Sequence, residues 1–113
     1  MWIASGDSTC AMCSKDFGFQ GAFRQARPEV GATVADVAND IEVDRLFHDV
    51  ASRLGGLDVL VNNAGIAGPT GPIEEIDPTE WRRCLEVGLT SQFLCARRAV
   101  PMLKAAGGEA MVK

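Results

Sequence analysis

The sequence lacks several groups on which a direct functional assignment could rest. It contains no tyrosine and one histidine, His48, so it offers no phenol for acid–base chemistry and no histidine cluster for a metal. No apolar run approaches the roughly 20 residues that span a bilayer, and no basic start followed by an apolar run suggests a secretory signal. We therefore expect a cytoplasmic protein without a membrane partner, in which His48 is a solvated surface residue rather than a catalytic or metal-binding one.

Basic charge is also scarce. Eleven lysines and arginines stand against fifteen aspartates and glutamates, which gives a net charge of −4, and no basic run is present. Nucleic-acid-binding surfaces are usually basic, so we expect no nucleic-acid partner.

The four cysteines do not indicate a disulfide or a metal site. Cys84 and Cys95 fall in one predicted helix, about 16 Å apart at about 1.5 Å of rise per residue, which is beyond disulfide reach. Cys10 and Cys13 form a CxxC, but no second CxxC or HxxxH completes four zinc ligands, and no thioredoxin-like helix is evident after it. We interpret this CxxC as a chance spacing of reduced thiols, against the alternatives of a zinc site or a redox pair.

Periodic patterning begins at Gly31. Residues 1–30 show no sustained period of 2 or 3.6, and we expect an atypical segment with a short strand at its start and a helical turn around Ala22–Gln25. The length of 113 residues and the 47% hydrophobic composition fit one globular domain or part of one. We place that domain at residues 31–113.

A strand and an amphipathic helix open this region. The β-branched run ATVADV (32–37) predicts the strand. Asn39 and Glu42 then have the spacing of a capping box, in which each side chain satisfies a backbone N–H at a helix start. The apolar residues of the helix share one face: Val43, Leu46, Phe47, Val50, Ala51 and Leu54. Gly55 and Gly56 stop it.

A second strand and a longer helix follow. LDVLV (57–61) is apolar at consecutive positions, which is typical of a parallel strand covered on both faces. Asp77, Pro78 and Glu80 are the N-cap, first and third residues of a helix start. The helix carries one apolar stripe: Trp81, Leu85, Leu89, Phe93, Ala96, Val100 and Leu103.

The last part of the chain repeats the pattern. Pro101 should kink or weaken the final turn of the long helix, Gly107 and Gly108 end it, and AMV (110–112) opens another strand. Strands that alternate with helices predict an α/β protein with a parallel sheet.

Two amides and two small residues follow the strand at 57–61. Ligands of open parallel sheets bind beyond the carboxyl ends of the strands, which is where Asn62 to Gly65 lie. Ala64 and Gly65 leave room for a flat ligand against the backbone, and the amides can join neighbouring loops by hydrogen bonds. From these four residues alone, a plain turn that leaves the strand is the better interpretation.

Three stretches together resemble the classical short-chain dehydrogenases/reductases. They are ADV (35–37), GGLDVLVNNAG (55–65) and DPTEWRRCLEVGLTSQFLCARRAVPML (77–103), in this order and at these separations. The resemblance covers about 80 residues and is greatest to bacterial members described as 3-oxoacyl-carrier-protein reductase-like. It implies a Rossmann fold, NAD or NADP as cofactor, and hydride transfer to or from a small-molecule alcohol or ketone.

The resemblance also implies roles for particular residues. Asp36 and Val37 match the acidic–apolar pair that borders the adenine pocket, although an ordinary aspartate at a strand end is the alternative for Asp36. The segment from Asn63 to Gly65 matches positions on the ribose and nicotinamide side, and Asn62 has a mainly structural role. The implied cofactor-binding residues are Asp36, Val37, Asn63, Ala64, Gly65 and Val87.

Three departures from the family limit this assignment. No TGxxxGxG turn, which holds the pyrophosphate at a helix amino terminus, precedes Asp36; GFQGAF has the wrong spacing. The family's serine and Tyr-x-x-x-Lys, which hold the substrate oxygen and move a proton, are absent. Gly88 stands where the family has the asparagine of a proton relay. That asparagine interrupts the regular hydrogen bonding of the helix. Glycine in a helix interior costs about 1 kcal/mol relative to alanine. We therefore predict no catalytic residue.

Topology leads to the same expectation. In a Rossmann sheet of order 3-2-1-4-5-6, strands 1 and 2 lie between strands 3 and 4. Residues 1–30 are too short to supply both strands with their helices, so the strand at 32–37 is expected to have no neighbour. We expect a partial Rossmann domain with strands 3-4-5 and the intervening helices, an internal piece whose front is truncated or replaced and whose back is cut off.

Two functional hypotheses follow. The first is an NAD(P)-dependent oxidoreductase whose full-length parent is a homodimer or homotetramer, with these 113 residues inactive alone. The second is a non-catalytic relative that binds a partner or dimerises through the long helix. Trp81 and Phe93, with the neighbouring arginines, are either part of a subunit contact or an ordinary core stripe beside a solvated face.

Overall fold

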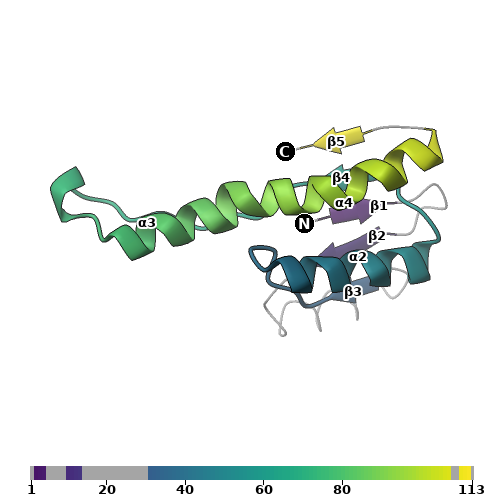
Figure 1. Cartoon of the computed structure of the whole chain (residues 1–113), viewed down its shortest axis with the longest axis horizontal. Coiled ribbons are helices and arrows are strands. Elements are labelled where there is room, and N and C mark those ends of the chain that lie inside the picture. The colour runs from purple at the N-terminus through teal and green to yellow at the C-terminus, as the bar shows by residue number, and fades with distance from the viewer. Residues whose placement is uncertain (1, 5–9, 14–30, 108–109, 113) are drawn as a thin grey trace.

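The computed structural model describes residues 2–4, 10–13, 31–107 and 110–112. These residues form a five-stranded sheet of order β3-β2-β1-β4-β5 (Figure 1). The strands are β1 Trp2–Ala4, β2 Cys10–Cys13, β3 Gly31–Thr33, β4 Val59–Val61 and β5 Ala110–Val112. The helices α2 (Asp40–Leu54) and α4 (Ser91–Ala106) cover one face of this sheet (Figure 1). The α/β architecture predicted from the alternation is confirmed.

The prediction that strand 3 has no neighbour is wrong. β3 pairs in parallel with β2, and β1 pairs antiparallel with both β2 and β4. Five positions separate β1 from β2, and an antiparallel pair needs no crossover helix. Thirteen residues are therefore enough to fill the two places between β3 and β4. The short strand expected at the start of the chain is confirmed, whereas the helical turn expected at Ala22–Gln25 lies outside the described residues.

The strand expected at 32–37 ends early, at Thr33. The Asp36 carboxylate accepts the N–H of Ala38 at 3.0 Å, and the Asp36 carbonyl accepts the N–H of Asn39 at 3.0 Å. Such local bonds from aspartate compete with a sheet ladder and favour a turn. Ala35 and Val37 are nevertheless buried, at 2% and 8% exposed. The β-branched pattern was therefore a signal of burial rather than of strand.

α2 begins with one half of the expected capping box. The Asn39 side chain accepts the N–H groups of Ile41 and Glu42, at 3.0 and 3.2 Å. The other half is wrong, because the Asn39 N–H donates to Asp36 and the Glu42 carboxylate lies 3.6 Å from Arg45 instead. At its end, Gly55 has the left-handed φ of 72° that the sequence predicted.

The predicted long helix is continuous but changes its hydrogen-bond pattern twice. α3 (Pro78–Leu85) begins at the N-cap Asp77, whose carboxylate accepts the N–H of Thr79 at 2.6 Å. A π-helical segment, η2 (Glu86–Thr90), follows and leads directly into α4. α4 includes Pro101 and ends at Gly107, with φ 72°. None of the described helices is both long and apolar enough to cross a membrane.

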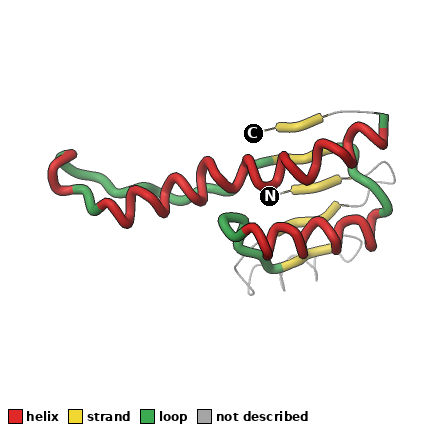
Figure 2. The backbone as a smooth tube through the Cα atoms, in the orientation of Figure 1, coloured by secondary structure: helices red, strands yellow, loops and turns green. Residues whose placement is uncertain are grey.

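Residues 62–90 form an arm that projects from the sheet (Figures 1 and 2). The loop that leaves β4 runs outward, turns at η1 (Ile73–Glu75), and returns as α3 and η2. Loop and helix are packed closely, because a Cβ on Gly68 would lie 3.0 Å from the Cys84 Sγ. With the arm, the molecule measures 50 × 32 × 22 Å.

The core lies between the two helices and the sheet. Its fully buried members include Val43 and Leu46 of α2, Leu60 of β4 and Ala99 of α4. Burial of this apolar surface is the main force that holds the helices to the strands.

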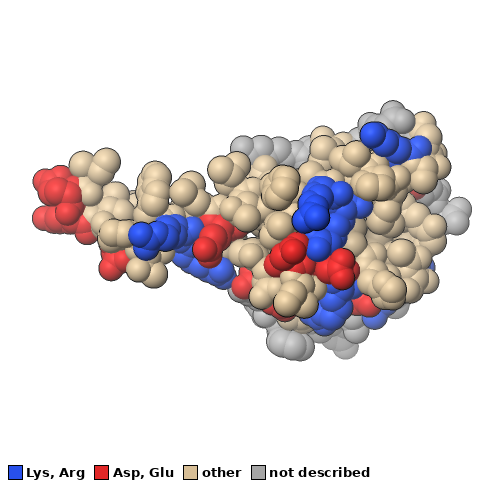
Figure 3. All heavy atoms as spheres, viewed as in Figure 1, with Lys and Arg blue, Asp and Glu red and all other residues tan. Residues whose placement is uncertain are grey.

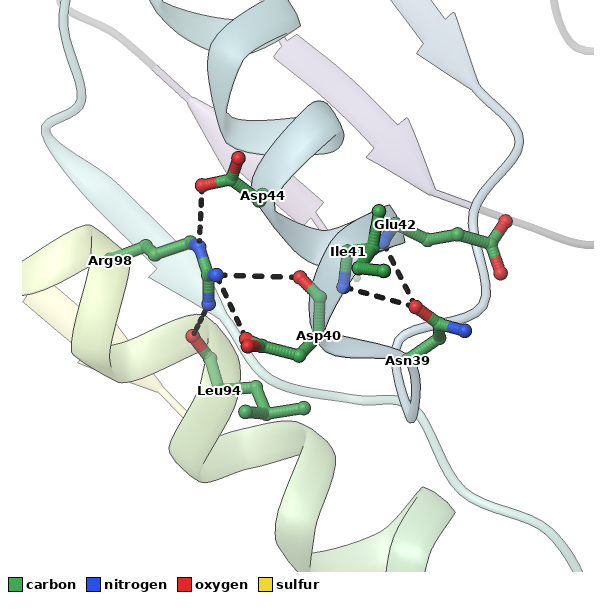
Figure 4. A network of polar contacts seen from close by, with 7 residues as sticks. All are labelled: Asn39, Asp40, Ile41, Glu42, Asp44, Leu94 and Arg98. Carbon is green, nitrogen blue, oxygen red and sulfur yellow. Dashed lines mark hydrogen bonds and ion pairs between the residues drawn. The ribbon is translucent and has the colours of Figure 1, made fainter.

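An arginine also joins the two helices (Figure 4). Arg98 of α4 lies 2.8 Å from an Asp40 carboxylate oxygen and 3.2 Å from one of Asp44, and it donates to the Asp40 carbonyl at 3.3 Å. Figure 3 shows basic and acidic side chains next to one another over the body of the molecule. Partial burial lowers the pKa of Arg98, but hydrogen bonds to Asp40 and Asp44 outweigh it and raise the pKa above its usual value. Arginine is protonated in proteins at any working pH, so both carboxylate contacts are ion pairs.

Candidate functional site

The loops after β3 and β4 leave the sheet at the same edge. β4 is antiparallel to β1, β1 is antiparallel to β2, and β2 is parallel to β3, so β3 and β4 point the same way. Their carboxyl ends lead to the Asp36 turn and to Asn62–Gly65. The structure thus brings both predicted ligand-binding stretches to one edge, as the rule for open α/β sheets requires.

The four residues after β4 divide into a buried and an accessible group. Asn62 is buried at 9% exposed, and Ala64 packs partly against the core. Asn63 and Gly65 are exposed. A Cβ built on Gly65 would meet nothing within 4 Å, so the backbone there is open to a flat ligand.

Asp36, Val37 and Ala38 of the turn after β3 are buried or half-buried. The Asp36 side chain is 22% exposed, and Arg83 lies 3.4 Å from its second carboxylate oxygen. Val37 is 8% exposed and belongs to the core.

Val87 and Gly88 lie in the π-helical segment. Ser91 donates its hydroxyl to the Val87 carbonyl, and Gln92 donates its amide to the Gly88 carbonyl at 2.8 Å. π-segments displace carbonyls from the regular helix ladder and occur often at functional sites. The helix interruption implied by the family's asparagine is therefore present with glycine in its place. Ser91 and Gln92 carry no motif, and nothing in the sequence identified their role.

A hollow of about 400 Å³ adjoins this edge. It lies between the loop Ile66–Pro69, which directly follows Gly65, and the α3 residues Thr79, Glu80 and Arg83. A volume of this size is in the range of small-ligand sites. Its lining combines apolar loop residues with one guanidinium, one carboxylate and one hydroxyl.

The centre of the sheet differs from a nucleotide-binding sheet. In that fold the central strand ends at this edge in a turn that holds the pyrophosphate. Here the central strand β1 runs in reverse, and its first residue, Trp2, pairs with Val61. Ala4, at the carboxyl end of β1, pairs with Val59 near the opposite edge. β1 therefore does not deliver a phosphate-binding turn to the site.

Candidate residues elsewhere do not join this site. His48 is exposed on α2, as predicted. The CxxC occupies strand β2, not the turn before a helix that a thioredoxin-like redox pair needs. Cys84 is half-buried and Cys95 buried, and both are free thiols. Within the described residues, no group of three histidine, cysteine or acidic side chains could hold a metal ion.

Comparison with known proteins identifies the family. A family model described as Enoyl-(Acyl carrier protein) reductase matches residues 14–112. The chain belongs to the short-chain dehydrogenase/reductase family. It is 44% identical over 110 residues to cis-4-hydroxycyclohexanecarboxylate dehydrogenase of Sinomonas cyclohexanicum. The aligned region covers 97% of this chain and 41% of that protein. It is 38% identical over 73 residues to 3beta-hydroxysteroid dehydrogenase of Mediterraneibacter gnavus. That aligned region covers 65% of this chain and 26% of that protein.

Solved structures of short-chain dehydrogenases agree. One from Streptomyces avermitilis matches 89% of this chain with a TM-score of 0.81 and 26% identity, and 38% of that chain is covered. One from Mycobacterium smegmatis matches 81% of this chain with a TM-score of 0.74 and 33% identity, and 40% of that chain is covered. This short-chain dehydrogenase/reductase chain thus spans about two fifths of the length of these structures.

Proposed function

We propose that these residues form part of a nicotinamide-dinucleotide site in an oxidoreductase that transfers hydride between NAD or NADP and a small alcohol or ketone. The observation that carries the proposal is that the loops after β3 and β4 leave the sheet at the same edge, and that the backbone at Gly65 in the second loop is open. The proposed cofactor contacts are Asp36, Val37, Asn63, Ala64, Gly65 and Val87. The cofactor, when bound, supplies the hydride chemistry.

The proposed residues have distinct parts in binding. Asp36 and Val37 border the adenine, at the turn that follows β3. The exposed Asn63 amide offers a donor and an acceptor to ribose hydroxyls. Ala64 and Gly65 keep the surface flat, since neither has a side chain longer than a methyl group.

The substrate class follows from what two relatives are named for. Two relatives take their names from a ring alcohol that bears a carboxylate. One is cis-4-hydroxycyclohexanecarboxylate dehydrogenase, and the other is trans-4-hydroxycyclohexanecarboxylate dehydrogenase, which is 57% identical to this chain over 56 residues. We infer a small cyclic secondary alcohol, or the matching ketone, as the substrate of the whole enzyme.

A matched pair of glycine variants tests the cofactor proposal. Gly65 follows β4 at the proposed site, whereas Gly56 precedes β4 at the opposite edge, and a Cβ at either position would meet nothing within 4 Å. Gly65→Leu is expected to abolish NADH binding by the 113-residue chain in a fluorescence titration, because its side chain would cover the flat surface. Gly56→Leu is expected to leave binding unchanged. Equal affinities for both variants would contradict the proposal.

One observation supports association through the long helix, which both functional hypotheses include. Four apolar residues at four-residue spacing lie exposed along α3, η2 and the start of α4: Trp81 (55%), Leu85 (42%), Leu89 (64%) and Phe93 (63%). Part of the predicted core stripe therefore faces outward, while Leu103 is buried. Exposed apolar patches of this kind mark interaction sites. We propose that this stripe pairs with a second copy in a homodimer or homotetramer.

A further inference from the structure

Arg83 connects the arm to the turn after β3. It lies on α3, 47 positions from Asp36, and its Nη2 is 3.4 Å from the Asp36 Oδ2. Its Nη1 is 3.8 Å from a carboxylate oxygen of Glu86, one helical turn further along. The Arg83 side chain is 43% exposed and that of Asp36 is 22% exposed, so the pair lies at the surface but not fully in water.

The Asp36 side chain is hydrogen-bonded to the backbone of its own turn. Its Oδ1 accepts the Ala38 N–H at 3.0 Å, and its carbonyl accepts the Asn39 N–H at 3.0 Å. One side chain therefore bonds to Arg83 on one side and fixes the backbone of Val37 and Ala38 on the other. A guanidinium that holds Asp36 also holds this backbone.

Arg83 borders the second half of the site as well. It lines the 400 Å³ hollow together with the loop Ile66–Pro69, which continues from Gly65. The guanidinium thus stands between the loop after β3 and the loop after β4. Its positive charge also offsets the Asp36 carboxylate, which would otherwise oppose an anionic dinucleotide.

We propose that Arg83 is a positioning residue for the dinucleotide, which acts through Asp36 to hold the adenine-side turn at the site. The proposal rests on the proposed function. It assigns Arg83 no contact with the reacting atoms.

The adjacent arginine provides a matched control. Arg82 is exposed on the same helix, so Arg82→Gln removes the same charge from α3 but not the bond to Asp36. Arg83→Gln is expected to raise the NADH dissociation constant about two- to fivefold, the range of a partly exposed ion pair. Arg82→Gln is expected to leave it unchanged, and Arg83→Lys to restore part of the loss.

A double-mutant cycle separates positioning from general stability. Asp36→Asn keeps an oxygen for the Ala38 N–H but removes the charge, so Asp36→Asn with Arg83→Gln should bind NADH no worse than Arg83→Gln alone. A merely structural role predicts a lower melting temperature for Arg83→Gln with the dissociation constant unchanged. That result, or additive losses in the cycle, would overturn the proposal.

A measurement without cofactor keeps this test distinct from that of the proposed function. In ¹⁵N–¹H spectra of the free protein, Arg83→Gln is expected to shift the Ala38 and Asn39 amides, and Arg82→Gln is not. Unshifted amides in Arg83→Gln would show that the contact between Arg83 and Asp36 does not hold the turn. If the amides shift while the unmodified chain binds no NADH, it is the proposed function that fails.

Discussion

Replacement of Arg98 by methionine should loosen the contact between α4 and the start of α2. Methionine keeps the apolar stem that packs along the helix, and it removes the guanidinium that reaches Asp40 and Asp44. The variant therefore isolates the charged contacts that Figure 4 shows.

The magnitude follows from the exposure of the partners. The side chains of Asp40 and Asp44 are 56% and 76% exposed, so both carboxylates regain water when Arg98 is lost. Each exposed ion pair contributes about 0.2–1 kcal/mol, and the hydrogen bond to the Asp40 carbonyl adds about 1 kcal/mol. We expect Arg98→Met to lower the free energy of unfolding by about 1.5–3 kcal/mol, no more than the loss for a broken buried pair.

Urea unfolding followed by circular dichroism measures this change. Arg97→Met is the control, because Arg97 is the exposed neighbour on α4 and is expected to change the free energy of unfolding by less than about 0.5 kcal/mol. High salt should reduce the difference between Arg98→Met and the unmodified protein, since it screens exposed pairs. Equal stabilities of Arg98→Met and Arg97→Met would show that the ion pairs of Arg98 do not stabilise the fold.

Three further predictions concern the arm and the chemistry. Gly68→Ala should lower the unfolding free energy by about 1 kcal/mol, since its Cβ would lie 3.0 Å from the Cys84 Sγ, and Cys84→Ala in the same chain should restore it in urea unfolding. If Cys84→Ala fails to restore stability, the steric explanation is wrong. Leu89→Asp should convert any dimer to monomer in sedimentation experiments, because it places a charge on the exposed stripe. Thr90→Asp, on the same turn, should leave association unchanged. Unchanged association in Leu89→Asp would show that the stripe is not part of the interface. The purified chain should show no NADH-dependent ketone reduction, since it contains no tyrosine, and measured turnover would contradict that.

Local signals predicted the helices well. Asn39, Gly55, Asp77 and Gly107 all occupy the cap positions that the sequence indicated. Caps act within one turn of the chain, so a short stretch of sequence contains the whole interaction. The same holds for the loop after β4, whose place beyond a strand end followed from the adjacent apolar run.

Non-local features were predicted less well. The hairpin of β1 and β2 was missed because strands of three and four residues give too little periodicity, and their stability depends on β3 and β4 as neighbours. The outward direction of Trp81 was left open because an apolar stripe on a helix does not specify what covers it. The contact of Arg83 with Asp36 joins residues 47 positions apart, and no local pattern could indicate it.

The most direct test of the account is a ¹⁵N–¹H titration of the 113-residue chain with NADH. The largest shifts are expected at the two loops of one sheet edge and at the π-segment, with Ala38, Gly65 and Val87 as reporters. The distal η1 turn, Ile73–Glu75, should be unaffected, since it lies at the far end of the arm (Figure 2). Absence of shifts at the sheet edge, or equal shifts at η1, would contradict a dinucleotide site at this edge.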